Sequence, residues 1–305
     1  MTIILAGASG DLGSRILDRL VAIGADVRCL VRSSTSADAI ESLRRRGAVQ
    51  VVAIDNRVDS MADAMQGGSV VISAVSGLRP VIVDSQSRLL QAATVAGVER
   101  FIPSDYAIDY RSIPSGANRN LNLREEFRVI ADQQSRVRVT SILNGAFSDL
   151  LTGVAPFVLF RINRVLCWGD PTQLMDWTTI DDTAAYTAHA AMDPSSPRYL
   201  RIAGDQLSAE GLCQVMSNIT GRQHRVLRPA GLKVLEKLIA LTRFFVPGGD
   251  AVYPPWQGMQ YMHNMYSGYA KFETVDNARY PVRFTRVEEL LRAYLNGERQ
   301  AYQLR

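Results

Sequence analysis

The sequence predicts an α/β fold in which a doubly wound parallel sheet precedes a smaller, mainly helical C-terminal part. Apolar runs rich in β-branched residues alternate with amphipathic helical patterns through the first half of the chain. A glycine-rich turn joins the first apolar run to the first helical pattern. After Asn144-Gly145 this alternation loosens, and helical patterns dominate. We therefore divide the chain into residues 1–148 and 149–305.

The first half contains six strand patterns separated by helical patterns. The strands are expected at about residues 2–6, 26–31, 49–54, 69–73, 99–102 and 137–143. The helices are expected to begin near Leu12, Ala37, Ser60, Pro80 and Leu121. This order is typical of parallel strands covered by helices on both faces, and six such strands complete a Rossmann sheet.

The second half contains five helix-like segments joined by short strands. They are expected at about residues 149–160, 181–192, 207–219, 230–244 and 285–297. The main loop signals there are Pro247-Gly248-Gly249 and Pro254-Pro255, and neither forms a long linker. We expect two closely packed parts, with the chain free to cross between them.

The composition is that of an ordinary soluble globular protein. The 305 residues are 47% hydrophobic and 21% charged, and the net charge of +4 is spread along the chain. Because the basic residues form no patch, we expect neither a nucleic-acid nor a membrane partner. The apolar stretch 232–246 contains Lys233 and Glu236, which makes it an amphipathic helix and not a membrane span.

The cysteine pattern points to a reducing compartment. Cys29, Cys167 and Cys213 are odd in number and widely spaced, which excludes a disulfide framework and a paired-cysteine metal site. The chain enters an apolar strand at Thr2, which leaves no room for a signal peptide. The sequence also lacks His-Glu-x-x-His and Gly-x-Ser-x-Gly patterns. We expect a cytoplasmic protein without a metal or hydrolase chemistry.

The first strand and helix are joined by a turn with the spacing GxxGxxG. Gly7 permits the tight exit from the strand, Gly10 lets the backbone approach a pyrophosphate, and Gly13 allows the helix to pack against the sheet. The helix N-terminus then offers free N–H groups and a partial positive charge to the phosphates. The turn residues expected to bind a dinucleotide are Gly7, Ser9, Gly10, Asp11, Leu12 and Gly13. A purely structural turn is the alternative.

The end of the second strand indicates which dinucleotide is bound. An NAD site usually has an acidic residue at this point, whereas this chain continues as Arg32-Ser33-Ser34. Arg32 can pair with a 2′-phosphate through two hydrogen bonds, and both serines can add hydroxyl donors. The cofactor is therefore expected to be NADP(H). The competing interpretation is an arginine solvated in a loop.

Five segments resemble the NmrA-like and isoflavone reductase-like atypical short-chain dehydrogenases. They are GASGDLG, LVR, VISAVSG (71–77), RFIPSDY (100–106) and NGAF (144–147). The resemblance implies that Asp55 and Asn56 lie near the adenine and that Ser73, Ala74 and Val75 lie along the cofactor. It also places Pro103 and Ser104 beside the nicotinamide ribose, and Asn144, Gly145 and Phe147 on the floor of the nicotinamide pocket. Each of these also follows an expected strand, where strand-end structure alone is the alternative.

The acid–base lysine of the family's reductases is missing. Arg124 aligns with it, and no lysine precedes Lys233, which also excludes a Tyr-x-x-x-Lys pair. An arginine stays protonated and is a poor general acid, but it can stabilise an oxyanion and orient a substrate. A proton would have to come from another group, and Tyr106, Asp105 and His263 are the candidates, each with a structural role as the alternative.

His263 lies in a run of aromatic and methionine residues, 253–269. Such a run suits the lining of an aromatic-substrate pocket, but plain core packing is the more frequent reason for it. The other histidines, His189 and His224, are expected to pack and to be solvated, respectively.

The leading hypothesis is an NADPH-dependent reductase that transfers hydride to a small apolar or aromatic substrate of the carbonyl, enone, quinone or benzylic ether type. The missing lysine also fits an NmrA-type sensor that binds NADP(H) without turnover, and a reaction that uses the cofactor only transiently is a third possibility. The sequence leaves open whether the protein is a monomer or a homodimer.

Overall fold

Six short strands form one parallel sheet in the computed structural model, which describes residues 1–303. Their order is β3-β2-β1-β4-β5-β6, so the direction of winding reverses between β1 and β4. The strands are β1 (Thr2–Ala6), β2 (Asp26–Arg32), β3 (Gln50–Ile54), β4 (Val70–Ser73), β5 (Arg100–Ile102) and β6 (Arg138–Val139). The predicted doubly wound sheet is confirmed.

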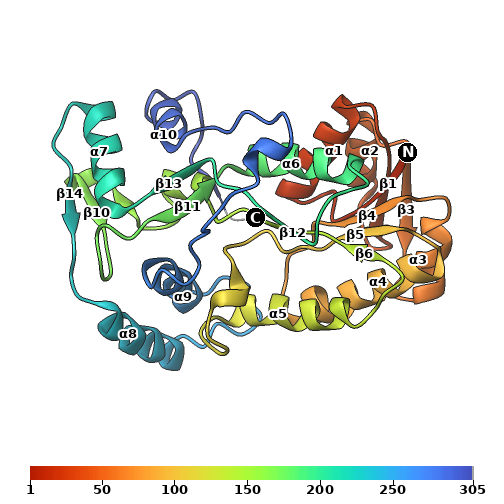
Figure 1. Cartoon of the computed structure of the whole chain (residues 1–305), viewed down its shortest axis with the longest axis horizontal. Coiled ribbons are helices and arrows are strands. Elements are labelled where there is room, and N and C mark those ends of the chain that lie inside the picture. Colours follow the sequence, from red (N-terminus) through yellow and green to blue (C-terminus); the bar gives the residue numbers. More distant parts are fainter. Residues whose placement is uncertain (304–305) are drawn as a thin grey trace.

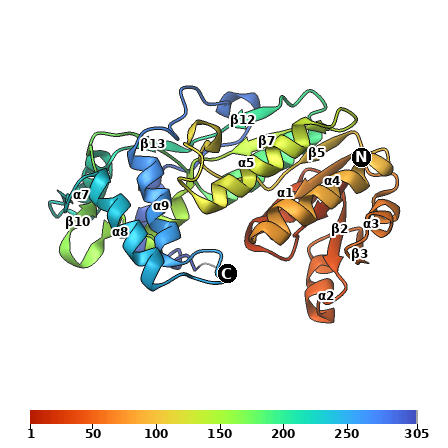
Figure 2. The ribbon, with the colours of Figure 1, turned by 90° about the horizontal axis from the view of Figure 1, so that it is seen from below.

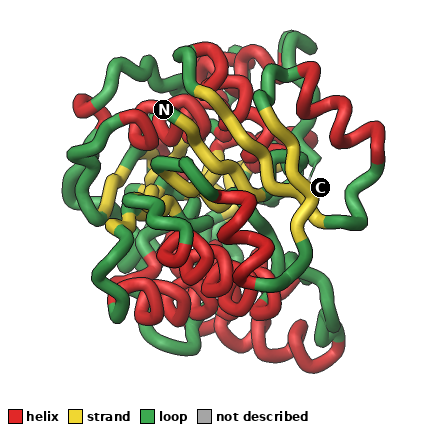
Figure 3. The backbone as a smooth tube through the Cα atoms, turned by 90° about the vertical axis from the view of Figure 1, so that its right-hand side faces the viewer, coloured by secondary structure: helices red, strands yellow, loops and turns green. Residues whose placement is uncertain are grey.

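Helices cover both faces of this sheet (Figure 1), and the end-on view of Figure 3 shows the strands between the helical layers. One face carries α1 (Asp11–Ala22), α2 (Ala37–Arg45) and α6 (Ile180–Met192). The other face carries α3 (Val58–Met65), α4 (Gln86–Val95) and α5 (Arg119–Asp132). A π-helical turn, η1 (Pro80–Ser85), leads directly into α4.

The strands are apolar on both faces because both faces are covered. Ile3 and Leu5 of β1 pack against the layer of α1 and α6, whereas Ile4 and Ala6 pack against the layer of α3, α4 and α5. All four side chains are at most 3% exposed. This two-sided burial explains why the strands read as continuous apolar runs instead of alternating patterns.

The sixth predicted strand is wrong as a single element. It divides at Thr140 into β6 and β7 (Ser141–Leu143) because the two pieces have different partners. β6 pairs with β5, whereas β7 pairs in parallel with β12 (Tyr199–Arg201). β7 and β12 thus form a separate two-stranded sheet, which joins the first half of the chain to a strand from the second half.

The predicted helix at 149–160 is also wrong. The segment forms a 3-10 turn, η3 (Ser148–Thr152), followed by the short strand β9 (Val158–Leu159) and a second 3-10 turn, η4 (Phe160–Ile162). Gly153 ends the first turn with a φ of +134°, and Pro156 then lacks the N–H that a helix would need. Helical spacing of apolar residues is therefore overridden by two helix-breaking residues.

The rest of the second half mixes small sheets with helices, seen from below in Figure 2. One sheet has the order β14-β10-β9 and another β13-β11-β8. Their strands are β8 (Ala146–Phe147), β10 (Arg164–Leu166), β11 (Met175–Thr178), β13 (Asp205–Leu207) and β14 (Arg225–Leu227). The helices are α7 (Ala209–Thr220), α8 (Leu232–Phe245), α9 (Pro255–Tyr266) and α10 (Val287–Leu295), and the short 3-10 turns η2 (Tyr110–Ser112) and η5 (Asn277–Arg279) complete the elements. The remaining predicted helices correspond to α6, α7, α8 and α10.

The chain crosses between its two parts through α6. This helix follows β11 in sequence, yet it packs against α1 and shares the core of Ile3, Leu17 and Tyr186. Buried Arg100 at the start of β5 holds the end of α6, because it donates hydrogen bonds of 2.6 and 2.9 Å to the carbonyls of Ala190 and Ala191. A cation at a helix C-terminus also offsets the helix dipole.

Candidate functional site

The glycine turn lies where the winding of the sheet reverses. It leaves the carboxyl end of β1 and packs against the chain that leaves β4, because a methyl group on Gly7 would lie 2.5 Å from the Ala74 carbonyl oxygen. In open α/β sheets this crevice between oppositely wound halves is the usual ligand site. The predicted segment 73–75 therefore lies beside the predicted turn.

Two of the three glycines are required by close backbone contacts. Gly7 has a φ of +83°, which other residues rarely adopt, and a methyl group on Gly13 would lie 2.1 Å from the Gly7 carbonyl oxygen. Gly10 closes the turn by donating its N–H to Gly7 at 3.0 Å. The backbone around the turn is thus packed too tightly for side chains, as the sequence predicts.

The N-terminus of α1 is open to an anion. Gly10 is its N-cap and provides no side-chain hydrogen bond, so the first N–H groups of the helix have no side-chain cap. Ser9 and Gly10 are exposed, and Asp11 in the first turn is held back by Arg15, which donates to it at 2.9 Å. Arg15 also donates to Asp181 of α6, at 2.5 Å. The acidic side chain next to the turn is therefore already neutralised by an ion pair.

Arg32 is exposed at the carboxyl end of β2, and no hydrogen bond or ion pair holds its guanidinium among the described residues. Ser33 and Ser34 are exposed beside it. The predicted adenine residues lie at the end of the neighbouring β3, where Asp55 accepts from the Arg57 N–H. Three adjacent strand ends thus bring the predicted residues to one edge.

The predicted residues after β4 and β5 are joined to each other. Ser104 donates from its hydroxyl to the Val75 carbonyl at 2.6 Å, and its N–H donates to the buried Gln86 side chain at 2.7 Å. Ser73 is fully buried, and its hydroxyl has no partner within residues 1–303. The sequence did not single out Gln86, since an isolated glutamine in a helical pattern carries no local signal.

Asn144 directly follows β7, and its side-chain amide has no hydrogen-bond partner among the described residues. The residue is 0% exposed, and neither the amide nitrogen nor the amide oxygen has a hydrogen-bond partner in the described part of the chain. An unpaired buried amide costs free energy unless a ligand satisfies it. The next residue, Gly145, has a φ of +66°, and a methyl group there would lie 2.3 Å from the Asp176 carbonyl oxygen. Phe147 follows, packed beside the sheet core.

Arg124 lies in the second turn of α5, close to the carboxyl ends of the strands because this helix runs back across the sheet. Its side chain is 8% exposed, and one hydrogen bond of 3.2 Å joins Nη1 to the Asn120 carbonyl. The buried Nε atom has no partner among residues 1–303. A cation in this position can face a bound substrate or cofactor.

A ladder of buried amides clamps α9 onto the start of α5. Asn118 accepts from Gln257 at 2.7 Å and donates to Asn264 at 3.0 Å, while Gln260 accepts from the Arg119 N–H at 3.2 Å. Residue-by-residue analysis of the sequence missed this ladder. The helical spacing of residues 257, 260 and 264 was the signal that could have revealed it.

Asp105 and Tyr106 are buried behind the site. Asp105 accepts hydrogen bonds from Tyr110 at 2.9 Å and Ser141 at 2.7 Å, and burial raises the pKa of its carboxyl. Tyr106 packs in the core beneath α6, and burial likewise raises its pKa. Both residues thus also fit the structural alternative, since they hold the loop after β5 against β7 and α6.

Comparison with known proteins places the chain in a family. A model of the NmrA-like family matches residues 1–289. The chain belongs to the NmrA-like family. The family resemblance drawn from the glycine turn and the strand-end motifs is confirmed.

Relatives of this NmrA-like protein include named oxidoreductases. It is 27% identical over 261 residues to the oxidoreductase swnN of Metarhizium robertsii, covering 74% of this chain and 75% of that protein. It is 27% identical over 236 residues to bifunctional pinoresinol-lariciresinol reductase 2 of Thuja plicata, covering 72% and 75%. With asnovolin J 5′,6′-dehydrogenase nvfM of Aspergillus novofumigatus it shares 30% over 239 residues, covering 72% and 69%.

Solved structures share the whole fold. The complex of AtPrR2 with NADP+ and (+)pinoresinol superposes with a TM-score of 0.80 at 22% identity, covering 96% of this chain and 98% of that one. An isoflavone reductase superposes with a TM-score of 0.81 at 19% identity, covering 96% and 99%. The likeness extends through the second half, so the small sheets and α7 to α10 belong to the shared architecture.

His263 faces α8 in the structure. Its Nε2 lies 2.9 Å from Glu236 Oε1 on α8, so the ring faces the neighbouring helix and an exposed carboxylate. Arg124 is on α5, where Tyr261 of α9 and Tyr253 act on it electrostatically. The same helix buries Met262 and Met265 in the second core, which fits the packing alternative for most of the run 253–269.

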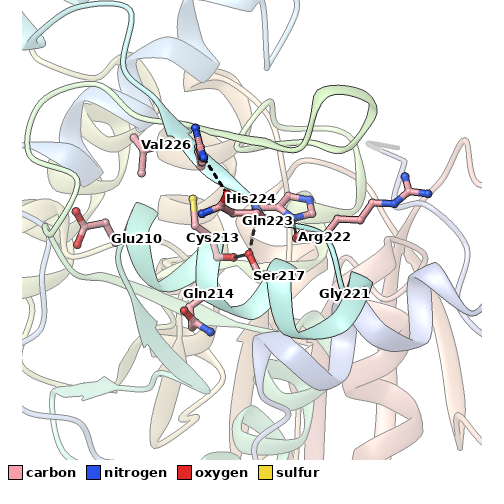
Figure 4. A pocket seen from close by; sticks show the side chains of 10 residues that line it. Glu210, Cys213, Gln214, Ser217, Gly221, Arg222, Gln223, His224 and Val226 are labelled. Carbon is pink, nitrogen blue, oxygen red and sulfur yellow. Dashed lines mark hydrogen bonds between the residues drawn. The ribbon is translucent and has the colours of Figure 1, made fainter.

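A hollow between α7 and β14 lies on a different part of the molecule (Figure 4). Its polar groups satisfy one another, because Ser217 donates to the Cys213 carbonyl at 2.7 Å and accepts from the His224 N–H at 2.9 Å. His224 is 5% exposed, so the expectation of a solvated ring is wrong. The hollow contains none of the predicted site residues.

Three general features of the described chain complete the picture. No helix within residues 1–303 combines the length and apolarity that crossing a bilayer requires. Over the same residues, no group of three or more His, Cys, Asp or Glu side chains is arranged to hold a metal ion. Burial raises the pKa of Cys29 to about 12 and of Cys213 to about 11, which makes these thiols poor nucleophiles near neutral pH.

Proposed function

We propose that this NmrA-like protein is an NADPH-dependent reductase acting on a small apolar or aromatic substrate of the carbonyl, enone, quinone or benzylic ether type. The observation that carries the proposal is the open glycine turn at the reversal point of the sheet, with unpaired Arg32 at the neighbouring strand end. Backbone N–H groups and an arginine without a partner suit a pyrophosphate and a 2′-phosphate, respectively. Several relatives with this fold are named reductases.

The proposed site residues divide by strand end. Those after β1 and β2 would hold the phosphates, those after β3 would contact the adenine, and those after β4, β5 and β7 would lie along the nicotinamide half. NADPH, when bound, supplies the hydride. The protein residues position the cofactor and the substrate, and they keep water away from the reacting carbon. Residues 1–148 would thus form the cofactor part and residues 149–305 the main substrate cover.

Arg124 is proposed to stabilise negative charge on the substrate, and not to transfer a proton. A guanidinium does not lose its proton near neutral pH, whereas its fixed charge stabilises an anionic group of the substrate strongly where water is excluded. Tyr106 remains the first proposed proton donor, and His263 is the second, because its ring already pairs with Glu236 on α8. Asp105 joins them on chemical grounds, since burial raises its pKa and favours the protonated carboxyl.

Transfer of deuterium from NADPH tests this function. The purified protein is incubated with NADPH deuterated at C4 and, separately, with an aromatic aldehyde, an enone, a quinone and a benzylic ether. We expect at least one substrate to be reduced as NADPH is oxidised. The product of the aldehyde, enone or benzylic ether keeps one deuterium on carbon, whereas a hydroquinone exchanges its deuterium with water. Tight NADPH binding without any oxidation across the panel would contradict a reductase.

A sensor that binds NADP(H) without turnover is the second candidate. It is favoured by one observation, the arginine at the position where the family's reductases carry their acid–base lysine. The same deuterium experiment separates the two functions, because a sensor binds the cofactor and leaves every substrate unchanged.

A further inference from the structure

Two arginines are buried in the described part of the chain, and they differ in what surrounds them. Arg100 is 3% exposed and donates two short hydrogen bonds to carbonyls at the end of α6. Arg124 is 8% exposed and makes one weak hydrogen bond of 3.2 Å, while its Nε is unpaired. The Arg100 guanidinium donates to structural partners, whereas the Arg124 guanidinium has N–H groups without hydrogen-bond partners.

No carboxylate within residues 1–303 forms an ion pair with Arg124 at 4.0 Å or less. Asp105 is the acidic group that acts on it electrostatically, and one Asp105 oxygen is already shared by Tyr110 and Ser141. Burial also raises the pKa of Asp105, which weakens its value as a counterion. The charge of Arg124 is therefore largely uncompensated in the free protein.

We propose that Arg124 receives an ionised carboxylate of the substrate, so that the substrate is an aromatic acid and not a neutral aromatic. This inference rests on the proposed function, because it specifies the molecule that lies beside the nicotinamide. A carboxylate matches the planar guanidinium with two parallel hydrogen bonds and neutralises the buried charge. Asn144, whose amide is buried and unpaired, offers a further polar contact at the same edge of the sheet.

The surroundings of Arg124 favour an aromatic acid over a small polar one. The loop before α9 reaches the start of α5, because the Val252 carbonyl accepts from Arg119 and Asn120, and Tyr253 and Tyr261 act electrostatically on Arg124. Burial raises the pKa of Tyr261 to about 12. The Tyr261 hydroxyl therefore stays neutral, so it does not repel a carboxylate and its ring presents apolar surface. The hydrogen bonds of Asn118 to Gln257 and Asn264 hold α9 against the start of α5. An aromatic ring beside the tyrosines and a carboxylate on the guanidinium would fit together.

Binding of two matched probes tests the proposal. trans-Cinnamate and trans-cinnamamide have the same shape, but only the first is charged at neutral pH. Each is titrated calorimetrically into the full-length protein saturated with NADP+. We expect cinnamate to bind at least about tenfold more tightly than the amide to the unaltered protein. R124Q should lower this ratio to about one, and R124K should retain part of it.

A control variant and a stability measurement separate charge recognition from folding. R128Q alters an arginine one turn further along α5 that pairs with Glu125 and Asp132, and it should leave the ratio unchanged. In the free protein, R124M should not lower the melting temperature and should raise it, because an uncompensated buried charge is removed. R100M should lower it, because two carbonyls lose their donors.

Several outcomes would overturn the proposal. They are equal or weaker binding of cinnamate relative to the amide, no binding of either probe, or a ratio that survives in R124Q. A loss of NADP+ affinity in R124Q as large as the loss of cinnamate affinity would assign the arginine to the cofactor instead. Failure of the proposed function looks different: NADP+ does not bind, or no substrate of the panel is reduced at the expense of NADPH, whatever the cinnamate ratio is.

Discussion

The two ends of the candidate site are built in different ways. The shape of the β1–α1 turn is defined by backbone contacts between residues a few positions apart. One example is the close approach of Gly13 to the Gly7 carbonyl. At the α5–α9 end, side chains separated by 146 positions make the contacts, as in the hydrogen bond from Asn118 to Asn264. Cofactor recognition thus depends on local backbone geometry, whereas the substrate end depends on tertiary packing. Changes at the two ends should therefore affect different measurements.

The largest effect is expected at the glycine turn. G13A places a methyl group 2.1 Å from the Gly7 carbonyl oxygen, so the turn must shift away from the phosphate site. NADPH affinity should fall at least about 100-fold, or about 2.7 kcal/mol, in a fluorescence titration. G258A is the control, because a methyl group there meets open space on α9. Unchanged affinity in G13A would show that the turn does not bind the cofactor.

At the opposite end, N118A should destabilise the fold without a direct effect on the cofactor. The substitution removes hydrogen bonds of 2.7 and 3.0 Å to α9 and leaves buried amides unpaired, at a cost of about 2–3 kcal/mol. Urea unfolding measures this loss, while the NADPH dissociation constant should change less than about twofold below the transition. A large loss of NADPH affinity in folded N118A would mean that the two ends are coupled.

Arg32 is expected to distinguish NADPH from NADH. R32A should weaken NADPH about 10- to 100-fold and leave NADH unchanged, since only NADPH carries the 2′-phosphate. R45A, another exposed arginine on the following helix, should alter neither affinity. Equal weakening of both dinucleotides would contradict the assignment of the 2′-phosphate to Arg32.

The buried Asp105 predicts a pH dependence of stability. Burial raises its pKa in the folded protein above the unfolded value of about 3.9, so its favourable contribution is complete below that value and is lost as the pH rises through the folded pKa. D105N is neutral at every pH. The free energy of unfolding of D105N minus that of the unaltered protein should therefore rise, by at most about 1.4 kcal/mol per pH unit, from pH 4 upward.

A flat difference across this range, measured by urea unfolding at each pH, would show that Asp105 ionises in the folded protein as it does in water. D170N provides a comparison, because Asp170 is a surface carboxyl whose pKa is lowered by hydrogen bonds from Thr172. Its difference should instead fall as the pH rises to about 5 and stay flat above that, since a lowered pKa adds stability only up to the unfolded value of about 3.9.

The smallest effect is expected for His263. H263Q should change the rate of any reduction less than about twofold, because the ring pairs with exposed Glu236 and a surface pair contributes little. Steady-state rates with the best substrate of the deuterium panel measure this. A loss of rate by orders of magnitude would restore His263 as the proton donor and would require α8 or α9 to move.

The sequence by itself determined the parallel sheet, the glycine turn and the arginine at the end of β2, because strand runs, turns and strand ends are local features. It did not determine that the strand through Thr140 divides between two partners, or that Gly153 and Pro156 stop a helix that apolar spacing favours. Both outcomes depend on contacts that these residues make in the folded chain, and not on their local sequence pattern.

Only the tertiary structure decided what surrounds each buried polar group. Arg124 was recognised from its position, but its lack of a counterion follows from the packing of α5, α9 and the loop after β5. Sequence spacing likewise could not show that His263 pairs with α8. The physical reason is that burial and hydrogen bonding are set by groups distant in the chain, while backbone turns are set by neighbours.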